Sequence, residues 1–494
     1  MSRRLAVLGI AMTLCFAALL AQLTNIQVAS AKRYANDPRN PQVVAARYSQ
    51  PRGRIVSADN VELAHSVPVT GHSTYKWQRV YDEPWAPLFE QVVGFDSLIY
   101  GLTGVEASYN AYLLSHNAPV RTLRDLLVTR TVQDTVYLTL STTMQLAAQR
   151  ALAGRAGAVV ALDPKTGAVL AMYSNPSFDQ NGLASLDART EQLAWLAGNT
   201  PDPNAGGFVP LTSLAYQDIF PPGSTFKIVT TSAAYDHAPQ LVDTPMPGYS
   251  CIPPGTLRGQ TTPLCNYADG YCGGTIAQML PPSCDTGYAL LGARIGAPSM
   301  SAEADAFGFN QQPPIDLPPS RFQVSQFLQP SCYQGAEVFL AFSSIGQKCT
   351  IASPLQMALV ASAIADGGVI MTPHVMAQIR DDQGDLVTTY RPRPWKTATS
   401  ATTAAAVKGL MQQVAQYGTA AGIFPAGEDV AAKTGTAQVG QGNTATTDWM
   451  IAFAPANDPK VAVAVVVPDQ PLSATGAQVA GPVMQQVIAA ALGG

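Results

Sequence analysis

Two serine–lysine pairs in this sequence have S-x-x-K spacing, in which a hydroxyl and an amine stand three residues apart. On a helix this spacing places both side chains on one face. An amine can take a proton from serine only if its pKa falls well below about 10.4, which burial or a second cation can cause. The pairs are Ser73 with Lys76 and Ser224 with Lys227.

The two pairs differ in their surroundings. The segment 221–223 reads Pro-Pro-Gly, which stops any upstream helix and allows a sharp turn before Ser224. We therefore expect Ser224 at a helix N-terminus, where its own N–H can face a developing oxyanion. An ordinary capped helix with an exposed lysine is the alternative. No helix-start signal precedes Ser73, so we interpret that pair as a coincidence.

Two further motifs follow Ser224 along the chain. They are Ser-Cys-Asp at 283–285 and Lys-Thr-Gly-Thr at 433–436. Lys-Thr-Gly also occurs earlier, at 165–167, where Asp-Pro precedes it and apolar β-type runs lie on both sides. That context is turn chemistry, so we expect a hairpin loop with a solvated lysine at 165–167.

In this order the motifs resemble the S-x-x-K, S-x-N and K-T-G set of serine acyl-transfer enzymes. The chain resembles the class B penicillin-binding proteins, which are peptidoglycan D,D-transpeptidases, and within them the actinobacterial A group. The resemblance runs from "PRGRIV" and "TGVE" through "VVALDPKTGAVLAMYSNPSFD" and "PPGSTFK" to "AAKTGTAQ" and "DWMIAFAP". The early Lys-Thr-Gly also belongs to the family pattern, as a structural feature.

The resemblance implies catalytic roles for three residues. Ser224 would attack the carbonyl of the penultimate D-alanine of a stem peptide, form an acyl-enzyme and release the terminal D-alanine. Lys227 would take the serine proton, and Ser283 would relay a proton to the leaving amine. An amine on a neighbouring stem peptide would then accept the acyl group and close a crosslink. β-Lactams would acylate and inhibit the same serine.

The resemblance also implies a substrate-binding set. Lys433 would supply positive charge, while the hydroxyls of Thr434 and Thr436 would bind the substrate carboxylate. The N–H groups of Ser224 and Thr436 would form the oxyanion hole. The full substrate-binding set is Asp285, Lys433, Thr434, Gly435 and Thr436.

Asp285 departs from the family pattern, which usually has asparagine there. An ionised aspartate only accepts hydrogen bonds, whereas asparagine also donates them. A carboxylate near Lys227 favours the charged ammonium and opposes its use as a base. Pairing of Asp285 with both lysines, or its protonation, are further possibilities. We hypothesise slower acylation, or a different pH optimum, than in an asparagine version.

Composition excludes several other classes of protein. The 494 residues predict two or three domains, and the net charge of −4 argues against a nucleic-acid binder. The five histidines are scattered, no two cysteines have C-x-x-C spacing, and no nucleotide-binding loop is present. We therefore expect neither a metal site nor a cofactor.

The N-terminus predicts export. Arg3 and Arg4 precede "LAVLGIAMTLCFAALLAQL", and the next charge is Lys32. Nineteen mostly apolar residues can cross a bilayer, and the arginines favour a cytoplasmic N-terminus with the rest outside. A cleaved signal peptide is the alternative, because the segment 29–31 reads Ala-Ser-Ala. We favour an uncleaved single-pass anchor in the cell membrane.

Export makes disulfides possible for the six cysteines beyond the apolar span. Six cysteines allow fifteen pairings, which the sequence does not distinguish, and some could be free and buried. For Cys284, inside the second motif, we guess Cys272 as the partner. The six are Cys251, Cys265, Cys272, Cys284, Cys332 and Cys349.

Three segments follow from these patterns: a cytoplasmic tip and anchor at 1–31, an N-terminal pedestal at 32–133, and a penicillin-binding transpeptidase domain at 134–494. Strand-turn-strand patterns at 156–174 and 448–468 and a helix at 476–492 enclose a mainly helical, loop-rich region. We therefore expect an α+β fold, in which helices flank an antiparallel sheet. The resemblance implies the penicillin-binding/transpeptidase form of that fold.

Other functions share parts of this pattern. A class D-like β-lactamase also uses S-x-x-K and K-T-G, but needs neither anchor nor pedestal. A D,D-carboxypeptidase or endopeptidase shares the acylation half of the reaction. A non-enzymatic paralogue, degenerate because of Asp285, could serve as a cell-wall scaffold or a sensor of muropeptides or β-lactams. No glycosyltransferase-like region is apparent, so we expect a membrane glycosyltransferase as partner.

Overall fold

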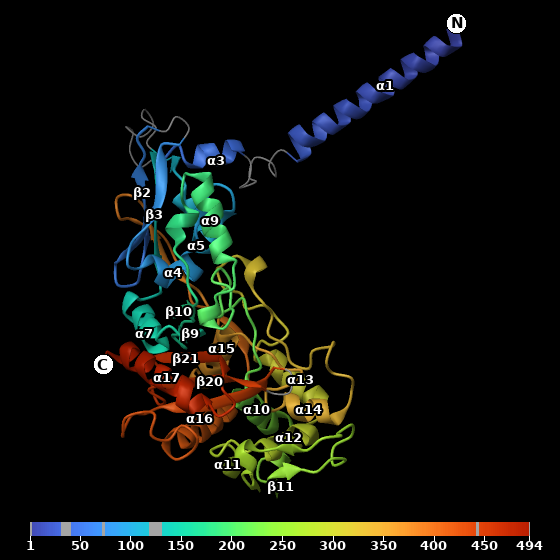
Figure 1. The fold of residues 1–494 in the computed structure, drawn as a ribbon, viewed down its shortest axis with the longest axis vertical. Helices are drawn as coiled ribbons and strands as arrows, with labels where there is room; N and C mark the ends of the chain where they lie inside the picture. The colour runs from blue at the N-terminus through green and yellow to red at the C-terminus, as the bar shows by residue number, and fades with distance from the viewer. Residues whose placement is uncertain (1, 31–40, 72–74, 118–130, 441–443, 494) are drawn as a thin grey trace.

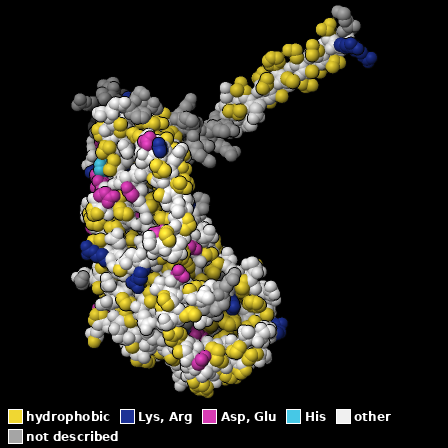
Figure 2. Space-filling view, in the orientation of Figure 1, with side chains coloured by type: hydrophobic (Ala, Val, Ile, Leu, Met, Phe, Trp, Pro, Cys, Tyr) yellow, Lys and Arg dark blue, Asp and Glu magenta, His cyan; other side chains and the backbone are white. Residues whose placement is uncertain are grey.

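The structure is a computed structural model that describes residues 2–30, 41–71, 75–117, 131–440 and 444–493. Its N-terminal helix α1 (Ser2–Thr24) continues as one π-helical turn to Ala29. The span Arg3–Val28 has a mean hydropathy of 2.2 and none of it is buried. Figure 1 shows α1 projecting from the rest of the molecule, and Figure 2 shows hydrophobic side chains along its surface. This helix is long and apolar enough for a single-pass anchor.

The pedestal is built on a six-stranded sheet of order β17-β16-β8-β1-β2-β3. Strands β1 and β2 form an antiparallel hairpin around Asn60, whose φ is +63°. The sheet also uses chain from far beyond residue 133, because β8 lies between β1 and β16. The strands are β1 (Ile55–Val56), β2 (Glu62–Pro68), β3 (Trp77–Tyr81), β8 (Thr135–Leu138), β16 (Met376–Arg380) and β17 (Leu386–Thr389).

Short helices cover this sheet. Two of them, α5 and α6, follow each other directly along the chain. Helix α9 lies beside the pedestal in Figure 1, where Trp195 stacks on Tyr100 with ring centroids 4.0 Å apart. The helices are α3 (Pro41–Arg47), α4 (Ala86–Val93), α5 (Gly104–Ser108), α6 (Asn110–Leu113), α8 (Gln180–Leu183) and α9 (Ala188–Gly198).

A buried ion cluster holds the pedestal together. Glu106 accepts hydrogen bonds from Arg52 Nε at 2.5 Å and from Arg79 Nε at 2.6 Å, and all three side chains are almost fully buried. Burial alone would raise the pKa of Glu106, but the two guanidinium groups hold it below its ordinary value. The cluster joins the chain before β1, strand β3 and helix α5.

A five-stranded antiparallel sheet of order β10-β9-β21-β20-β19 forms the second core. Nearly every residue of β9, β20 and β21 is buried, which explains their continuous apolar runs. Helices α7 and α17 pack together on one face, and α15 and α16 on the other. The elements are α7 (Thr142–Leu152), β9 (Gly157–Leu162), β10 (Val169–Asn175), α15 (Pro354–Ala365), α16 (Ala401–Gln416), β19 (Ala431–Val439), β20 (Ala445–Ala454), β21 (Val461–Gln470) and α17 (Gly476–Leu492).

This arrangement confirms the predicted α+β fold, including both hairpins and the terminal helix. Between β10 and β19 lies the expected helical and loop-rich region, in which a disulfide joins the short strands β12 and β13. Its elements are α10 (Lys227–His237), β11 (Met246–Tyr249), β12 (Cys251–Ile252), β13 (Leu264–Cys265), β14 (Cys272–Gly274), α11 (Ile276–Met279), α12 (Asp285–Ile295), α13 (Ala297–Ala306), α14 (Glu337–Ser343), β15 (Val369–Met371) and β18 (Pro394–Thr397).

All six cysteines beyond α1 are paired. The bonds are Cys251–Cys265, Cys272–Cys284 and Cys332–Cys349, so the guessed partner of Cys284 is the one found. Cys15, exposed on α1, is the free cysteine of the described residues.

Replacing Glu106 by glutamine should destabilise the pedestal strongly, because buried Arg79 loses its carboxylate partner and buried Arg52 keeps only the more distant Asp96, at 3.7 Å. We expect a loss of about 3–5 kcal/mol of unfolding free energy, measured by urea denaturation of the detergent-solubilised chain. The matched control is Glu62→Gln, which removes an exposed partner of Arg54 at 3.4 Å and should cost about 0–1 kcal/mol. Equal losses in the two variants would contradict a structural role for the cluster.

Candidate active site

Ser224, the serine of the second S-x-x-K pair, lies on a tight turn that is held in place by contacts with other segments. Residues 223–226 form a 3₁₀ turn, and α10 begins at Lys227, so the helix start predicted at Ser224 is present in this tighter form. Gly223 has φ +53° and donates its N–H to the carbonyl of Gly346 at 2.9 Å. A Cβ on Gly346 would lie 2.1 Å from the Gly223 oxygen. Only a residue without a side chain allows this approach.

The second motif lies at the start of α12. Cys284 is the N-cap of this helix and Asp285 is its first residue, where the helix dipole favours a carboxylate. Ser283 has a left-handed backbone, with φ +62°. Such a conformation is unfavourable for a residue with a side chain and persists where surrounding contacts hold it. Here the disulfide from Cys284 to Cys272 fixes the next residue.

The third motif lies on the edge strand β19, directly against the serine turn. A Cβ on Gly435 would lie 2.8 Å from the carbonyl oxygen of Pro222, so glycine permits the contact. From the neighbouring strand, Trp449 Nε1 donates to the carbonyl of Pro221 at 2.9 Å. The sheet therefore sets the position of the turn through its backbone.

The three motifs meet at two lysine amines. Lys227 Nζ donates to Asp285 Oδ1 at 2.7 Å and to the Ser283 carbonyl at 2.7 Å, and lies 3.3 Å from Ser283 Oγ. Lys433 Nζ donates to the same Ser283 Oγ at 2.8 Å. Segments that are far apart in sequence thus converge on one site, as the motif order predicts.

The nucleophile candidate contacts the carboxylate and not the amine. Ser224 Oγ donates to Asp285 Oδ1 at 3.3 Å. Among the described residues no hydrogen bond joins the Ser224 hydroxyl to the Lys227 amine; the two residues are joined through the backbone, where the Lys227 N–H donates to the Ser224 carbonyl. The same Asp285 oxygen accepts from both, so it bridges the hydroxyl and the amine. The aspartate noted in the sequence is therefore part of the contact network around the serine.

Burial shapes the charges of both lysines. Both side chains are fully buried. Burial lowers the pKa of Lys227, and the Asp285 carboxylate opposes that shift. For Lys433, burial and the nearby Lys227 charge lower the pKa well below its ordinary value, again against Asp285. An amine with a lowered pKa can accept a proton near neutral pH, which a solvated lysine does not do.

The threonines of the third motif are already hydrogen-bonded. The hydroxyls of Thr434 and Thr419 lie 2.6 Å apart, and Thr436 Oγ1 accepts the Gly476 N–H at 2.9 Å. Thr434, Gly435 and Thr436 all line one cavity with Ser224.

That cavity has a volume of about 1240 Å³. It contains residues that sequence reasoning missed: Lys348, Thr419 and the loop 266–271. The cysteine spacing carried a signal for the loop, because Cys265 and Cys272 stand immediately on either side of it.

The early Lys-Thr-Gly is a turn, as predicted. The Gly167 N–H donates to the Asp163 carbonyl at 2.9 Å, closing the loop between β9 and β10. Lys165 is half-exposed, and its Nζ lies 2.6 Å from Asp458 Oδ1. Of the other S-x-x-K pair, Ser73 lies outside the described residues.

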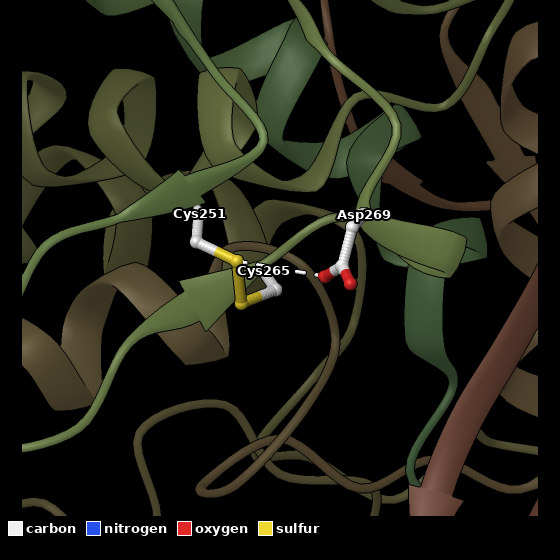
Figure 3. Close-up of side chains that lie close together, drawn as sticks. All are labelled: Cys251, Cys265 and Asp269. Carbon is white, nitrogen blue, oxygen red and sulfur yellow. Dashed lines mark hydrogen bonds between the residues drawn. A yellow bond between two sulfur atoms is a disulfide. The ribbon is translucent and has the colours of Figure 1, made fainter.

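Two clusters in the described part of the chain have the residue types of metal ligands. In the first, the sulfurs of Cys251 and Cys265 are bonded to each other beside Asp269, so neither is a thiolate (Figure 3). The second, made of Glu62, His65 and Asp82, lies on the pedestal sheet. Neither cluster brings a ligand to the three motifs.

A buried carboxyl lies behind the third motif. Asp448 on β20 is opposite Thr436 and is fully buried. Burial raises its pKa to about 7, and the hydroxyls of Thr436 and Thr446 oppose the shift. Because neither carboxylate oxygen has a hydrogen bond of regular geometry in the described residues, burial outweighs those hydroxyls.

Asp448→Asn should therefore stabilise the protein in a pH-dependent way. The folded protein keeps the Asp448 proton up to about pH 7, whereas the unfolded chain loses it near pH 4, so wild-type stability falls as pH rises between these values. The gain in Tm from asparagine should grow from pH 5 to pH 8, measured by calorimetry of the detergent-solubilised chain.

The control is Asp458→Asn. Hydrogen bonds from Lys165 and Lys460 lower the pKa of exposed Asp458 to about 2, so it is ionised in both states across this range. Its effect on Tm should not change with pH. A gain for Asp448→Asn that is the same at pH 5 and pH 8 would refute the raised pKa.

Comparisons with known proteins agree with the geometry. Residues 157–489 match the family model described as penicillin binding protein transpeptidase domain. Residues 52–135 match the penicillin binding protein A dimerisation domain. The first match contains all three motifs, and the second falls on the pedestal.

Relatives match over almost the full length. The chain is 36% identical to peptidoglycan D,D-transpeptidase PbpA of Mycolicibacterium smegmatis, with 98% of each chain covered. It is 35% identical to PbpA of Mycobacterium tuberculosis, with 96% of each covered. The structure of M. tuberculosis penicillin-binding protein A as a ceftriaxone acyl-enzyme superimposes with a TM-score of 0.79 at 34% identity, covering 91% of this chain and 100% of that one. The chain therefore belongs to the penicillin-binding protein transpeptidase family.

Proposed function

We propose that the chain is a serine-type peptidoglycan D,D-transpeptidase in which Ser224 forms the acyl-enzyme and which β-lactams acylate and inhibit. The observation that carries the proposal is the contact network around Ser224. Its hydroxyl lies beside the Asp285 oxygen that also accepts from buried Lys227. The mycobacterial relatives named as D,D-transpeptidases, and the β-lactam acyl-enzyme of one of them, support the assignment.

In the first half of the reaction, Ser224 Oγ attacks the carbonyl carbon of the penultimate D-alanine. Its proton passes to the free amine of Lys227, which lies close to the serine because the same Asp285 oxygen accepts from both groups. The N–H groups of Ser224 and Thr436 hold the oxyanion. The peptide C–N bond then breaks. Ser283 Oγ, placed between the two lysine amines, gives its proton to the leaving D-alanine amine and receives the one that Lys227 took from Ser224.

In the second half, an amine of a second stem peptide attacks the acyl carbon. The ester C–O bond breaks, the amine gives up one proton, and Ser224 Oγ regains one. Lys433, Thr434 and Thr436 hold the donor carboxylate and chain in place, with Gly435 and Asp285 completing the substrate-binding set. If water attacked instead, the enzyme would be a D,D-carboxypeptidase. The cavity of about 1240 Å³ favours transfer, because it has room for a second peptide beside the donor.

We also propose an extracytoplasmic location for the catalytic region. Helix α1 would be the anchor, with Arg3 and Arg4 on the cytoplasmic side. Three disulfides fit an oxidising compartment. The proposed segments remain 1–31 for tip and anchor, 32–133 for the pedestal and 134–494 for the transpeptidase. A membrane glycosyltransferase would supply the glycan strands.

Covalent labelling by a fluorescent penicillin tests the role of Ser224. Ser224→Ala should abolish labelling, because the variant has no hydroxyl to form the ester. Lys433→Ala should slow labelling about 100-fold or more, since a buried positive charge in the site is lost. The matched controls are Ser73→Ala and Lys165→Ala from the other two motif copies, and both should label like wild type. Labelling of Ser224→Ala on another residue would refute the assignment.

Asp285→Asn tests the bridging carboxylate. Its negative charge raises the pKa of both lysines, so its removal should lower them further. The acidic limb of the pH profile of acylation should move down by about one pH unit, with faster acylation at neutral pH. Rates of penicillin acylation between pH 5 and 9 measure this, with exposed Asp458→Asn as control. If the pH profiles of acylation for Asp285→Asn and wild type were superimposable, the Asp285 carboxylate would not limit the use of Lys227 as a base.

A further inference from the structure

The loop 266–271 between β13 and β14 forms one wall of the cavity that contains Ser224. It carries two large aromatic side chains that are mostly in solvent: Tyr267 is 58% exposed and Tyr271 is 77% exposed. The Tyr271 hydroxyl lies directly against Gly248. A Cβ added to Gly248 would be only 2.5 Å from this hydroxyl. Exposed aromatic faces at the rim of a substrate cavity are typical of ligand contacts.

The loop is held firmly to the catalytic motif. Cys265, just before it, is bonded to Cys251, and Cys272, just after it, is bonded to Cys284. Within the loop, buried Asn266 accepts the Thr286 N–H at 2.9 Å and donates to the Gly270 carbonyl at 2.7 Å. Thr286 is the neighbour of Asp285, so the loop and the second motif move together.

Two adjacent loop residues have left-handed backbones although neither is glycine. Ala268 has φ +50° and Asp269 has φ +53°. The disulfides and the Asn266 side chain hold this unfavourable conformation in place. Asp269 lies between the two tyrosines in the sequence, and it lines the cavity as they do.

The Asp269 carboxylate has no cationic side chain beside it in the described part of the chain. Among the described residues it makes no ion pair, and Cys251 Sγ, 3.6 Å from its Oδ1, has no proton to donate because it is in the disulfide (Figure 3). The cavity lining has two other charged side chains. Asp285 is paired with Lys227, while the Nζ of Lys348 lies 5.4 Å from the centre of the Phe342 ring.

An unneutralised carboxylate that lines the same cavity as two exposed tyrosines offers the chemistry that binds an ammonium group. We propose that Asp269, Tyr267 and Tyr271 form the subsite that binds the amine-bearing stem peptide of the acceptor strand. The inference rests on the proposed function and extends it from the donor to the acceptor. The carboxylate concentrates the ammonium form in the cavity, and the free base in equilibrium with it attacks the Ser224 ester.

The test separates acceptor binding from acylation. The detergent-solubilised full chain receives a D-alanyl thioester donor and a synthetic stem peptide with a free side-chain amine as acceptor. Asp269→Asn should raise the acceptor KM about three- to tenfold, with an unchanged rate of Ser224 acylation by fluorescent penicillin. Tyr271→Ala should do the same. The wild-type acceptor KM should rise with ionic strength, and that of Asp269→Asn should respond much less.

Two controls test whether the effect depends on the charge of Asp269 and of the acceptor amine. Asp458→Asn, an exposed change outside the cavity, should leave the acceptor KM unchanged. An N-acetylated acceptor peptide, which has lost its charge, should not compete with the free-amine peptide. An unchanged acceptor KM in Asp269→Asn, with normal acylation, overturns this inference and leaves the transpeptidase assignment intact. Failure of both donor and penicillin to acylate the wild type would overturn both.

Discussion

The active centre depends on one constraint, which is the burial of two lysine amines beside a single serine hydroxyl. Lys227 and Lys433 are fully buried and both contact Ser283 Oγ. Two ammonium groups so close together repel each other in a medium of low polarity, and each resists protonation. Asp285 relieves this repulsion by pairing with Lys227. Asp285 therefore favours the charged form of Lys227, while burial favours its neutral form. In the proposed mechanism, this balance sets the pH at which Ser224 can lose its proton.

The positions of these groups are fixed mainly by backbone approach. The serine turn is hydrogen-bonded to Gly346 and to the indole of Trp449, and Gly435 lies against Pro222. Side chains at the glycines would push the turn away from the sheet. Rigid contacts of this kind keep reacting groups within the few tenths of an ångström that catalysis requires. The small residues near the motifs thus matter as much for geometry as the reactive ones do for chemistry.

Local patterns were sufficient to predict the hairpins at 156–174 and 448–468, helix α17 and the convergence of the three motifs. They did not reveal that β16 and β17 complete the pedestal sheet, because pairing between segments more than two hundred residues apart leaves no local trace. The boundary at residue 133 stays a prediction, since this sheet crosses it. The contact of Asp285 with Ser224, and not only with a lysine, depends on side-chain geometry that spacing does not encode.

The disulfides give these parts a common frame. Cys284 lies between the two reactive residues of the second motif, and its bond to Cys272 ties that motif to the loop 266–271. The proposed donor site and the exposed tyrosines, which line the same cavity, are therefore held in a fixed relation. Transfer to an amine competes with hydrolysis, because water reaches any open acyl-enzyme. Transfer to the amine exceeds hydrolysis only if the enzyme holds the amine in the right place, because the effective concentration of the amine rises steeply when its orientation is fixed. A loop that is disulfide-bonded to the second motif can keep the amine oriented in this way, whereas a loop without such a bond would lose that orientation whenever it moved.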